Sequence, residues 1–312
     1  MKTAHINEYG GKEAVEINDT VSKPQAEAGK IVVEIRAAGV NPIDWKIRQG
    51  YMAQMMPLQF PATMGGDFSG VVTEVGEGVS GFSAGDEVYG QAGVLLGGSG
   101  TFAEYALVSA QNVAQKPKNI SHQEAAGLPL AGVSALQALS ENIDLKKGQK
   151  ILIHGGGGGV GSFAVQLAKY LGAYVYTTVS TEDAAYVKGL GADEVIDYTA
   201  QKFEDLVTDC DAVFDMAGGE TYTRSFSVLK KGGIIVSMVE QPNTELMEKY
   251  GVRSISQFTQ PTREKLEKLA VLVEQGVVKV HIDKTFPLDE TAEALSYLET
   301  GHPQGKVVLE VK

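Results

Sequence analysis

The stretch Ile151-Leu152-Ile153-His154-Gly155-Gly156-Gly157-Gly158-Gly159-Val160-Gly161 sets an apolar run beside five consecutive glycines, and a helical pattern follows it. This order predicts a strand, a tight turn and a helix start. Gly156, Gly158 and Gly161 have the G-x-G-x-x-G spacing, in which missing β-carbons let the backbone approach a pyrophosphate. The helix N-terminus offers unpaired N–H groups to the same anion. A flexible loop is the alternative reading of so many glycines, and the downstream sequence disfavours it.

Downstream of the glycines, apolar runs of strand length alternate with amphipathic runs of helical length. Right-handed crossovers between such units give a parallel sheet whose ligands bind beyond the carboxyl ends of the strands. We therefore predict a dinucleotide-binding domain in the middle of the chain. The predicted strands are Tyr174–Val179, Glu194–Asp197, Ala212–Asp215, Ile234–Ser237 and Val277–Ile282, and the predicted helices are Thr181–Gly189, Phe203–Val207, Thr221–Leu229 and Thr262–Gln275.

The end of the second strand of this domain indicates which dinucleotide is bound. An Asp or Glu there would hydrogen-bond both ribose hydroxyls of NAD, whereas this chain has Thr177-Thr178-Val179-Ser180-Thr181. Hydroxyl groups without a carboxylate favour the 2′-phosphate of NADPH over NADH. No lysine or arginine that could bind the 2′-phosphate follows closely, the nearest being Lys188. Glu182 and Asp183 are interpreted as acids in the first turn of the next helix.

The composition bounds the class of protein. The 312 residues exceed one typical domain, and 43% hydrophobic content supports a sizeable core. With 27 basic and 39 acidic residues the net charge is −12, and without a basic cluster this argues against nucleic acid or an anionic membrane as partner. Because the sequence shows neither a long apolar run nor a signal-like N-terminus, we expect a cytoplasmic protein. The single cysteine, Cys210, excludes an internal disulfide and a Cys-rich zinc site and is expected to pack in the core.

The first 120 or so residues have a different sequence pattern, in which short β-type runs are interrupted by Gly, Pro and Asp. Such spacing predicts a barrel-like β lobe. The C-terminal run Gly305–Val311, which follows a helical pattern at Asp289–Glu299, is expected to return to that lobe. The predicted domains are therefore 1–123 with 283–312, and 124–282. The β-type runs are Lys30–Ala38, Gly70–Val75, Glu87–Tyr89 and Phe102–Val108.

Six motifs in order carry a resemblance over nearly the whole chain. Together with the glycine loop, the chain resembles the zinc-independent quinone oxidoreductase branch of the medium-chain dehydrogenase/reductase superfamily. This resemblance implies an α/β protein with a GroES-like β-rich lobe and a Rossmann doubly wound parallel sheet, NADPH as cofactor, a quinone or activated alkene as acceptor, and a homodimer, for which Val277–Ile282 is the candidate edge strand. The motifs are Ala38–Asp44, Gly65–Val72, Gly85–Val88, Gly100–Tyr105, Ala125–Pro129 and Gly305–Val308.

The positions that hold zinc in related dehydrogenases are replaced here. Those relatives place a Cys where this chain has Asn41, a His-Glu pair where it has Gly66-Asp67, and a four-Cys lobe at Gly90–Gly100. Catalytic zinc needs three strong ligands, so we expect no metal. Without a Lewis acid, reduction of an electron-poor acceptor is favoured over oxidation of an alcohol. His154 is interpreted as supporting the glycine loop and not as a base.

The resemblance also assigns roles to individual residues. Asn41 is expected near the nicotinamide, Ser134 near the phosphates or the nicotinamide, and Lys306 between the lobes. Water or Tyr51 would donate the proton, although Tyr51 could equally be a packing residue in a Met-rich loop. The other expected cofactor contacts are Gly156, Gly158, Gly159 and Val160 at the pyrophosphate, Thr178, Ser180 and Tyr198 around the adenosine ribose and its 2′-phosphate, and Ala217, Gly218, Val236, Ser237 and Met238 near the nicotinamide ribose.

Two other functions stay open from the sequence. A double-bond reductase for 2-alkenals or enones would use the same cofactor chemistry with a different acceptor pocket. A catalytically idle NADPH-binding protein would keep the glycine loop and lack turnover. The segments expected to shape the acceptor pocket, Gln49–Phe60 and Val239–Phe258, follow no recognisable motif, so the acceptor itself is not predicted.

Overall fold

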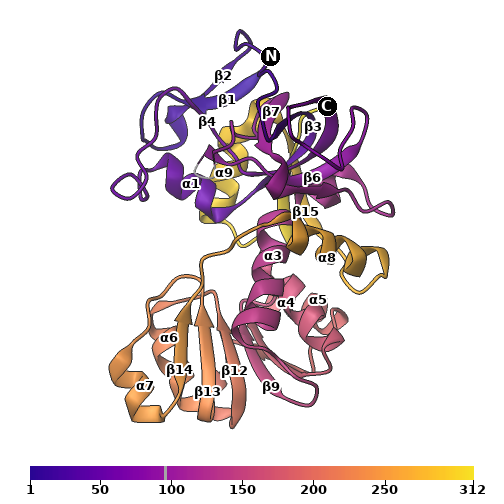
Figure 1. The fold of residues 1–312 in the computed structure, drawn as a ribbon. Coiled ribbons are helices and arrows are strands. Elements are labelled where there is room, and N and C mark those ends of the chain that lie inside the picture. The colour runs from indigo at the N-terminus through magenta and orange to yellow at the C-terminus, as the bar shows by residue number, and fades with distance from the viewer. Residues whose placement is uncertain (95–96) are drawn as a thin grey trace. The chain divides into compact units, whose positions relative to one another are not determined.

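The computed structural model describes residues 1–94 and 97–312, which form two compact units (Figure 1). Unit 1 comprises Met1–Leu130, Pro261–Gln275 and Val280–Lys312, and unit 2 comprises Ala131–Gln260 and Gly276–Lys279. Unit 2 thus comes mainly from the middle of the chain, and unit 1 comes from the two ends of the chain and from the segment that separates the two parts of unit 2. Each unit is described by itself below.

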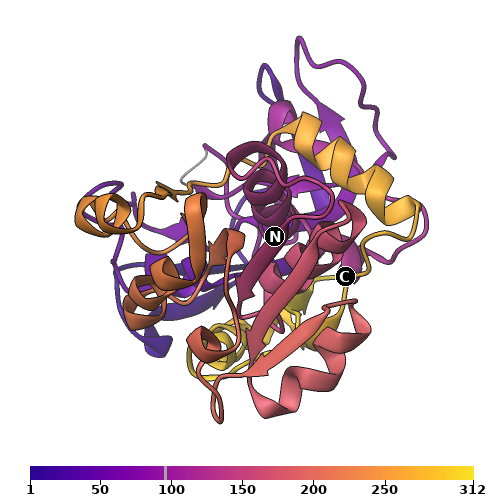
Figure 2. The same ribbon diagram turned by 90° about the horizontal axis from the view of Figure 1, so that it is seen from below.

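Unit 2 is a doubly wound parallel sheet with strand order β11-β10-β9-β12-β13-β14. Figure 1 labels β9, β12, β13 and β14 of this sheet, and Figure 2 shows the same ribbon turned by 90°. The direction in which successive strands are added reverses between the central strands β9 and β12. In such sheets a nucleotide binds at the carboxyl ends of the two strands that flank this reversal. Two strands begin and end as predicted, and two others begin earlier than predicted, at Cys210 and Leu229. The strands are β9 (Lys150–His154), β10 (Tyr174–Val179), β11 (Glu194–Asp197), β12 (Cys210–Asp215), β13 (Leu229–Ser237) and β14 (Arg253–Ser256).

One predicted strand is wrong. In the segment predicted as the strand Val277–Ile282, the structure begins a strand only at Ile282, and that strand, β15 (Ile282–Pro287), pairs with β16 in unit 1. The sixth strand of the unit 2 sheet is instead β14, from a segment in which the sequence showed no motif. In the described sheet, the strands at the two edges are β11 and β14. A homodimer stays a prediction, and Val277–Ile282 does not supply its edge.

The helices of unit 2 pack their apolar residues on the sheet. On one face, Tyr222 and Phe226 form a core with Leu152 and Ile235 of the strands, and Tyr250 packs against it. The segment predicted as the helix Phe203–Val207 forms only a single 3₁₀ turn. The helical elements are α3 (Pro129–Gln137, which starts in unit 1), η4 (Ala138–Asn142), α4 (Gly159–Tyr170), η5 (Thr181–Asp183), α5 (Ala184–Gly189), η6 (Phe203–Asp205), α6 (Gly219–Ser225), η7 (Phe226–Val228) and α7 (Thr244–Tyr250).

Unit 1 is β-rich, with a seven-stranded sheet and a three-stranded sheet of order β2-β1-β4. The larger sheet has the order β15-β16-β3-β5-β6-β8, and β7 also pairs with β3. The antiparallel pairing of β16 with β3 confirms that the C-terminal strand returns to the first lobe. The strands are β1 (Thr3–Ile6), β2 (Val15–Asn18), β3 (Lys30–Val40), β4 (Ala62–Thr63), β5 (Asp67–Val75), β6 (Glu87–Gln91), β7 (Tyr105–Ser109), β8 (Val113–Gln115) and β16 (Lys306–Glu310).

Helix α8 (Arg263–Glu274) forms where a helix was predicted, but it belongs to unit 1. The buried Tyr89 hydroxyl donates to the Leu266 carbonyl at 2.6 Å, and Asn119 Nδ2 donates to the Val273 carbonyl at 3.1 Å. The predicted boundaries, 1–123 with 283–312 and 124–282, therefore differ from the observed division at both junctions. The other helices of unit 1 are α1 (Pro42–Arg48), α2 (His122–Ala126) and α9 (Thr291–Thr300).

Two smaller predictions concern the core and the membrane. Cys210 is buried at the start of β12, where burial raises the pKa of its thiol to about 12, in keeping with a packing role. Among the helices of the described part of the chain, none has the length and apolar character needed to cross a bilayer.

Candidate functional site

The glycine loop connects β9 to α4 and confirms the predicted strand, turn and helix start. β9 ends at His154, and Gly155 follows with a positive φ of 73°. The chain then reaches α4, for which Gly158 is the N-cap in an extended conformation. The loop lies beside the reversal of strand order, where the carboxyl ends of β9 and β12 point the same way. A nucleotide phosphate is expected at such a place.

The three glycines of the G-x-G-x-x-G pattern have different roles. A β-carbon on Gly156 would lie 2.1 Å from Thr177 Oγ1, and one on Gly161 would lie 2.1 Å from the Gly155 carbonyl oxygen. Both positions are therefore closed to any side chain. A β-carbon on Gly158 would meet only the Gly155 oxygen, at 3.6 Å. Gly156 and Gly161 allow the loop to pack, whereas a β-carbon on Gly158 would meet no atom closer than 3.6 Å.

His154, the last residue of β9, supports the start of this loop through two side-chain contacts. Its Nδ1 lies 3.0 Å from Thr178 Oγ1 and its Nε2 lies 2.8 Å from Ser225 Oγ. Burial, with a smaller contribution from Arg224, lowers the pKa of the imidazole to about 3. A neutral, fully buried ring that ties β9 to β10 and α6 agrees with the sequence interpretation of a support. It also places the Thr178 hydroxyl inside the unit, because that hydroxyl is engaged with His154.

The corner expected to hold the adenosine ribose contains a carboxylate. Ser180 precedes η5, and its hydroxyl lies 3.4 Å from Asp183 Oδ2. That same oxygen would be 2.6 Å from a β-carbon on Gly157, so Asp183 lies directly beside the glycine loop. Tyr198, just after β11, is 52% exposed. The sequence identified Asp183 only as a first-turn acid, and its position beside the loop comes from the chain reversal after β10.

At the carboxyl ends of β12 and β13, Asp215 joins two loops. It is fully buried, and its Oδ1 accepts from the backbone N–H groups of Ala217 and Gly218, both at 3.0 Å. Its Oδ2 accepts from the Ser237 hydroxyl at 2.7 Å. Ser237 Oγ in turn accepts from the N–H groups of residues 239 and 240, at 3.2 and 3.0 Å. The Ser237 hydroxyl is thus engaged within the loops. Sequence reasoning missed Asp215, for which an acid ending an apolar strand was the available signal.

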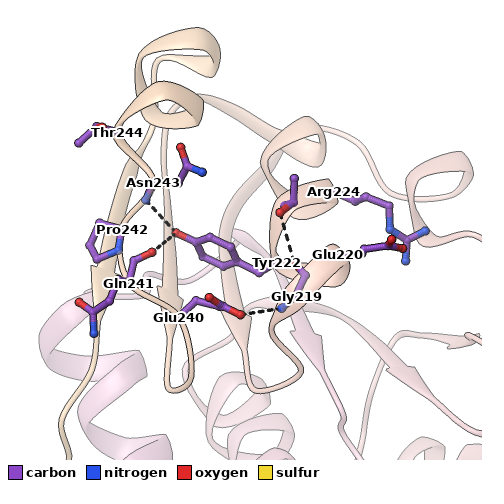
Figure 3. Close-up of a pocket in the computed structure, with 10 residues that line it drawn as sticks. Gly219, Glu220, Tyr222, Arg224, Glu240, Gln241, Pro242, Asn243 and Thr244 are labelled. Atoms are coloured by element: carbon purple, nitrogen blue, oxygen red, sulfur yellow. Dashed lines mark hydrogen bonds between the residues drawn. The ribbon is translucent and has the colours of Figure 1, made fainter.

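A cavity of about 670 Å³ opens beside these loops (Figure 3). The Tyr222 hydroxyl reaches across it, donating to the Gln241 carbonyl at 3.2 Å and accepting from Asn243 N–H at 3.3 Å. Glu240 Oε1 accepts from Gly219 N–H at 2.7 Å. The segments that line the cavity directly follow the residues predicted to contact the nicotinamide ribose. Of those residues, Val236 is buried in β13 and Met238 is half-buried. The lining residues are Gly219, Glu220, Tyr222, Thr223, Arg224, Glu240, Gln241, Pro242, Asn243 and Thr244.

Ser134 lies in α3 and is fully buried. Its hydroxyl is 2.7 Å from Thr259 Oγ1, and its carbonyl accepts from Gln257 Nε2 at 2.9 Å. These contacts tie α3 to the segment that follows β14. The structure therefore gives Ser134 a link within unit 2, and its predicted contact with the cofactor stays a prediction.

In unit 1, Asn41, Asp67 and Lys306 meet in one buried cluster. The Asn41 carboxamide donates from Nδ2 to Asp67 Oδ2 at 2.9 Å and accepts at Oδ1 from Lys306 Nζ at 2.6 Å. Asp67 also accepts from Gln91 Nε2 at 2.9 Å and from Leu130 N–H at 3.1 and 3.2 Å. None of the three side chains is more than 4% exposed. The two predicted residues, Asn41 and Lys306, thus lie together, with the lysine directed at the asparagine.

The charged side chains of this cluster shift one another's pKa values. Burial raises the pKa of Asp67 and lowers that of Lys306, while each is the main charge favouring the ionised form of the other. Asp44, which accepts from Asn41 N–H at 2.7 Å, is a second buried carboxyl, and burial raises its pKa to about 7. The Lys306 side chain thus lies near two buried carboxyl groups, whose charges oppose the effect of its burial on its pKa.

The cluster lies where the zinc-binding relatives were expected to hold metal ligands. Over residues 1–94 and 97–312, no group of three His, Cys, Asp or Glu side chains is arranged to hold a metal ion. Within the stretch compared with the four-Cys lobe, Leu95 and Leu96 lie outside the described residues.

Tyr51, the predicted proton donor, lies after α1 and is 69% exposed. Its ring meets Trp45 edge-on, with the centroids 6.0 Å apart. Met55 in the same loop is 71% exposed. The aromatic and Met side chains thus leave an apolar, accessible loop in unit 1, and the role of Tyr51 as an acid stays a prediction.

Sequence families described as alcohol dehydrogenase GroES-like domain and zinc-binding dehydrogenase match residues 27–118 and 190–309. A 2-methylene-furan-3-one reductase of Solanum lycopersicum is 40% identical over 99% of this chain and 79% of its own length. The structure of a quinone oxidoreductase from Coxiella burnetii, 35% identical, superposes with a TM-score of 0.92 over 100% of this chain and 99% of that one. An Escherichia coli quinone oxidoreductase complexed with NADPH, 28% identical, has a TM-score of 0.89 and full coverage of both chains.

Proposed function

The chain belongs to the quinone oxidoreductase branch of the medium-chain dehydrogenase/reductase superfamily, and from this membership we propose that it reduces a quinone or another activated carbonyl or alkene with NADPH. That it is an NADPH-dependent oxidoreductase follows from its relatives. The observation that carries the proposal is the glycine loop, where Gly156 and Gly161 are closed to side chains and Gly158 leaves room for a phosphate.

We propose that Gly158, Gly159 and Val160 hold the pyrophosphate with the N-terminus of α4. Ser180 and Tyr198 would line the adenosine ribose, and the loops joined by Asp215 would line the nicotinamide ribose. NADPH supplies the hydride when it is bound. The protein contributes orientation, exclusion of water and a polar contact to the reacting groups. Asn41 is the residue proposed to contact the nicotinamide, and Lys306 supports it.

The proton required by the reduction has a proposed source in unit 1. Tyr51 is accessible, and a phenol can donate a proton in the presence of a developing negative charge. For an enone, the hydride would add to the β-carbon and the proton to the α-carbon. For a quinone, hydride and proton together would give the hydroquinone. Water is the alternative donor, and a Tyr51→Phe variant with unchanged turnover would identify it.

A second acceptor class is favoured by one observation. The tomato relative that is 40% identical is named for a 2-methylene-furan-3-one, in which an exocyclic alkene is conjugated to a ketone. Reduction of an enone or 2-alkenal is therefore proposed as the alternative to quinone reduction. Both reactions need the same cofactor position, and the two differ in the shape of the acceptor site.

The test is NADPH and NADH oxidation by purified protein of measured zinc content, with benzoquinone, phenanthrenequinone and a 2-alkenal as acceptors. We expect turnover with NADPH that exceeds turnover with NADH, and turnover that does not depend on zinc. The ratio of quinone to alkenal rates then selects between the two acceptor classes. Tight NADPH binding without turnover of any acceptor would instead support the catalytically idle binding protein, and activity that is lost on zinc removal would support alcohol dehydrogenation.

A further inference from the structure

We propose that Lys306 and Asp67 are positioning residues that hold the carboxamide of Asn41 in one orientation for contact with the nicotinamide of the cofactor. The inference rests on the proposed function, because it takes NADPH as the ligand. It replaces the expected role of Lys306 as a direct cofactor contact with an action through Asn41.

The orientation follows from the charges on either side of the amide. Lys306 Nζ, which can only donate, lies 2.6 Å from Asn41 Oδ1. An Asp67 carboxylate oxygen, which accepts, lies 2.9 Å from Asn41 Nδ2. Rotating the amide by half a turn would set its NH₂ group against the ammonium and its oxygen against the carboxylate. Both hydrogen bonds would then be replaced by repulsive contacts, so only one orientation is compatible with the cluster.

The two supporting residues are themselves fixed. Lys306 begins β16, whose register sets Val307 opposite Val40, and its ammonium also donates to the Val40 carbonyl at 3.4 Å. Asp67 begins β5 and accepts from Gln91 as well as from the backbone of residue 130. Strands hold such groups more rigidly than loops do. Asn41 itself precedes α1, with its N–H bonded to Asp44.

The fixed amide retains hydrogen-bonding capacity for a ligand. A carboxamide has two N–H donors and two oxygen lone pairs. One donor goes to Asp67, which leaves the second N–H of the amide for a ligand, while the oxygen accepts from Lys306. The hydrogen bond from an ammonium to the amide oxygen also polarises the amide and strengthens its remaining donor. A neutral residue at position 306 would remove both the orientation and the polarisation.

The experiment is a double-mutant cycle of Lys306→Met and Asn41→Ala, read by equilibrium binding of NADPH and of 2′-phospho-ADP-ribose, which lacks nicotinamide. We expect each single variant to weaken NADPH binding by roughly threefold to thirtyfold and to leave binding of the fragment within about twofold. In the Asn41→Ala background, Lys306→Met should weaken NADPH binding by no more than about twofold, because the residue through which it acts is gone.

Lys116→Met is the matched control, because Lys116 is another buried lysine of unit 1 and donates to the carbonyls of Pro117 and Ile120. It should lower stability without changing the ratio of NADPH to fragment affinity. If Lys306→Met does not fold, Asp67→Asn takes its place in the same cycle and should show the same non-additivity with Asn41→Ala.

Two results would overturn the inference. One is the same loss of NADPH affinity from Lys306→Met in both backgrounds, which would mean a direct contact. The other is an equal loss for NADPH and for the fragment, which would mean a general structural effect. Neither reading requires turnover. If no acceptor is reduced, that result counts against the proposed function. The binding measurements of the double-mutant cycle still test the role of Lys306.

Discussion

The Ser237 hydroxyl donates a hydrogen bond of 2.7 Å to the carboxylate of Asp215, and this bond joins the carboxyl ends of β12 and β13. Each partner also accepts from two backbone N–H groups of the loop that follows its own strand, so the two side chains together shape both loops. These are the loops proposed to line the nicotinamide ribose. The bond therefore connects the stability of unit 2 with the geometry of its cofactor site.

Replacing Asp215 by Ala should destabilise the protein by roughly 2 to 4 kcal/mol, because the N–H groups of Ala217 and Gly218 and the Ser237 hydroxyl lose their acceptor inside the protein. Urea unfolding measures this loss. Asp205→Ala, at an exposed acid of the same unit, is the control and should change stability by less than about 0.5 kcal/mol. Equal stability of the two variants would show that the buried carboxylate does not hold the loops.

Alanine at Gly156 should impair folding, whereas alanine at Gly158 should impair NADPH binding. The β-carbon of Gly156→Ala would lie 2.1 Å from Thr177 Oγ1, so we expect a loss of several degrees in Tm or a failure to fold. Gly158→Ala has a negative φ and a nearest contact of 3.6 Å, so its Tm should stay nearly unchanged while NADPH binding weakens by roughly tenfold or more. Thermal unfolding and cofactor titration test both. Undiminished NADPH binding by Gly158→Ala would contradict a phosphate at this loop.

His154 should make the protein less stable in mild acid. Burial holds the pKa of the folded imidazole at about 3, below its ordinary value of 6.5. Between these values the unfolded chain binds more protons, so stability is present above pH 6.5 and falls as the pH falls toward 3. From pH 7 to pH 5 this amounts to about 2 kcal/mol. His154→Gln, compared with the parent by urea unfolding at pH 7 and pH 5, should lose less stability between the two. Parallel losses would mean that His154 does not titrate in this way.

Asp183 should limit the preference for NADPH. Its carboxylate lies beside the glycine loop and the Ser180 hydroxyl, where it would repel a 2′-phosphate. Asp183→Asn is expected to raise the NADPH-to-NADH ratio of kcat/KM by roughly threefold to tenfold, as expected for one charge near a partly exposed site. Glu182→Gln, at the neighbouring exposed acid, is the control and should change the ratio much less. A ratio that stays constant in Asp183→Asn would place the 2′-phosphate away from this corner.

The parts of the fold that local patterns dictate were predictable from the sequence. β10 and β11 begin and end where their apolar runs do, and the glycine loop stands between a strand and a helix. The strand β14 was missed because Arg253–Ser256 carries a single strongly apolar residue and is held by pairing with β13. The assignment of α8 to unit 1 was missed for a related reason. Its amphipathic pattern shows that Leu266 and Leu269 are buried but not which core they enter.

For the candidate site, residue identity was easier to predict than contact. Asn41 and Lys306 were identified through the resemblance, but only the pairing of β16 with β3 shows that one donates to the other. Asp215 was missed because a single acid at a strand end has many possible roles in a sequence. The positions of Ser237 and Thr178 were predicted for the cofactor, and the structure shows that their hydroxyls bond to Asp215 and His154. Side-chain direction at a strand end depends on tertiary contacts that no local pattern records.

The return of β16 to β3 has a consequence for the order in which a growing polypeptide can acquire its structure. Asn41 and Lys306 are 265 positions apart, and all of unit 2 lies between them in the sequence. Domains fold as units while synthesis proceeds from the N-terminus. Unit 2 can therefore complete its sheet while Asp44 and Asp67 still lack the lysine that faces them. During that interval these carboxyl groups would have to stay hydrated or protonated, which makes the first lobe a late-maturing part of the nascent protein despite its being synthesised first.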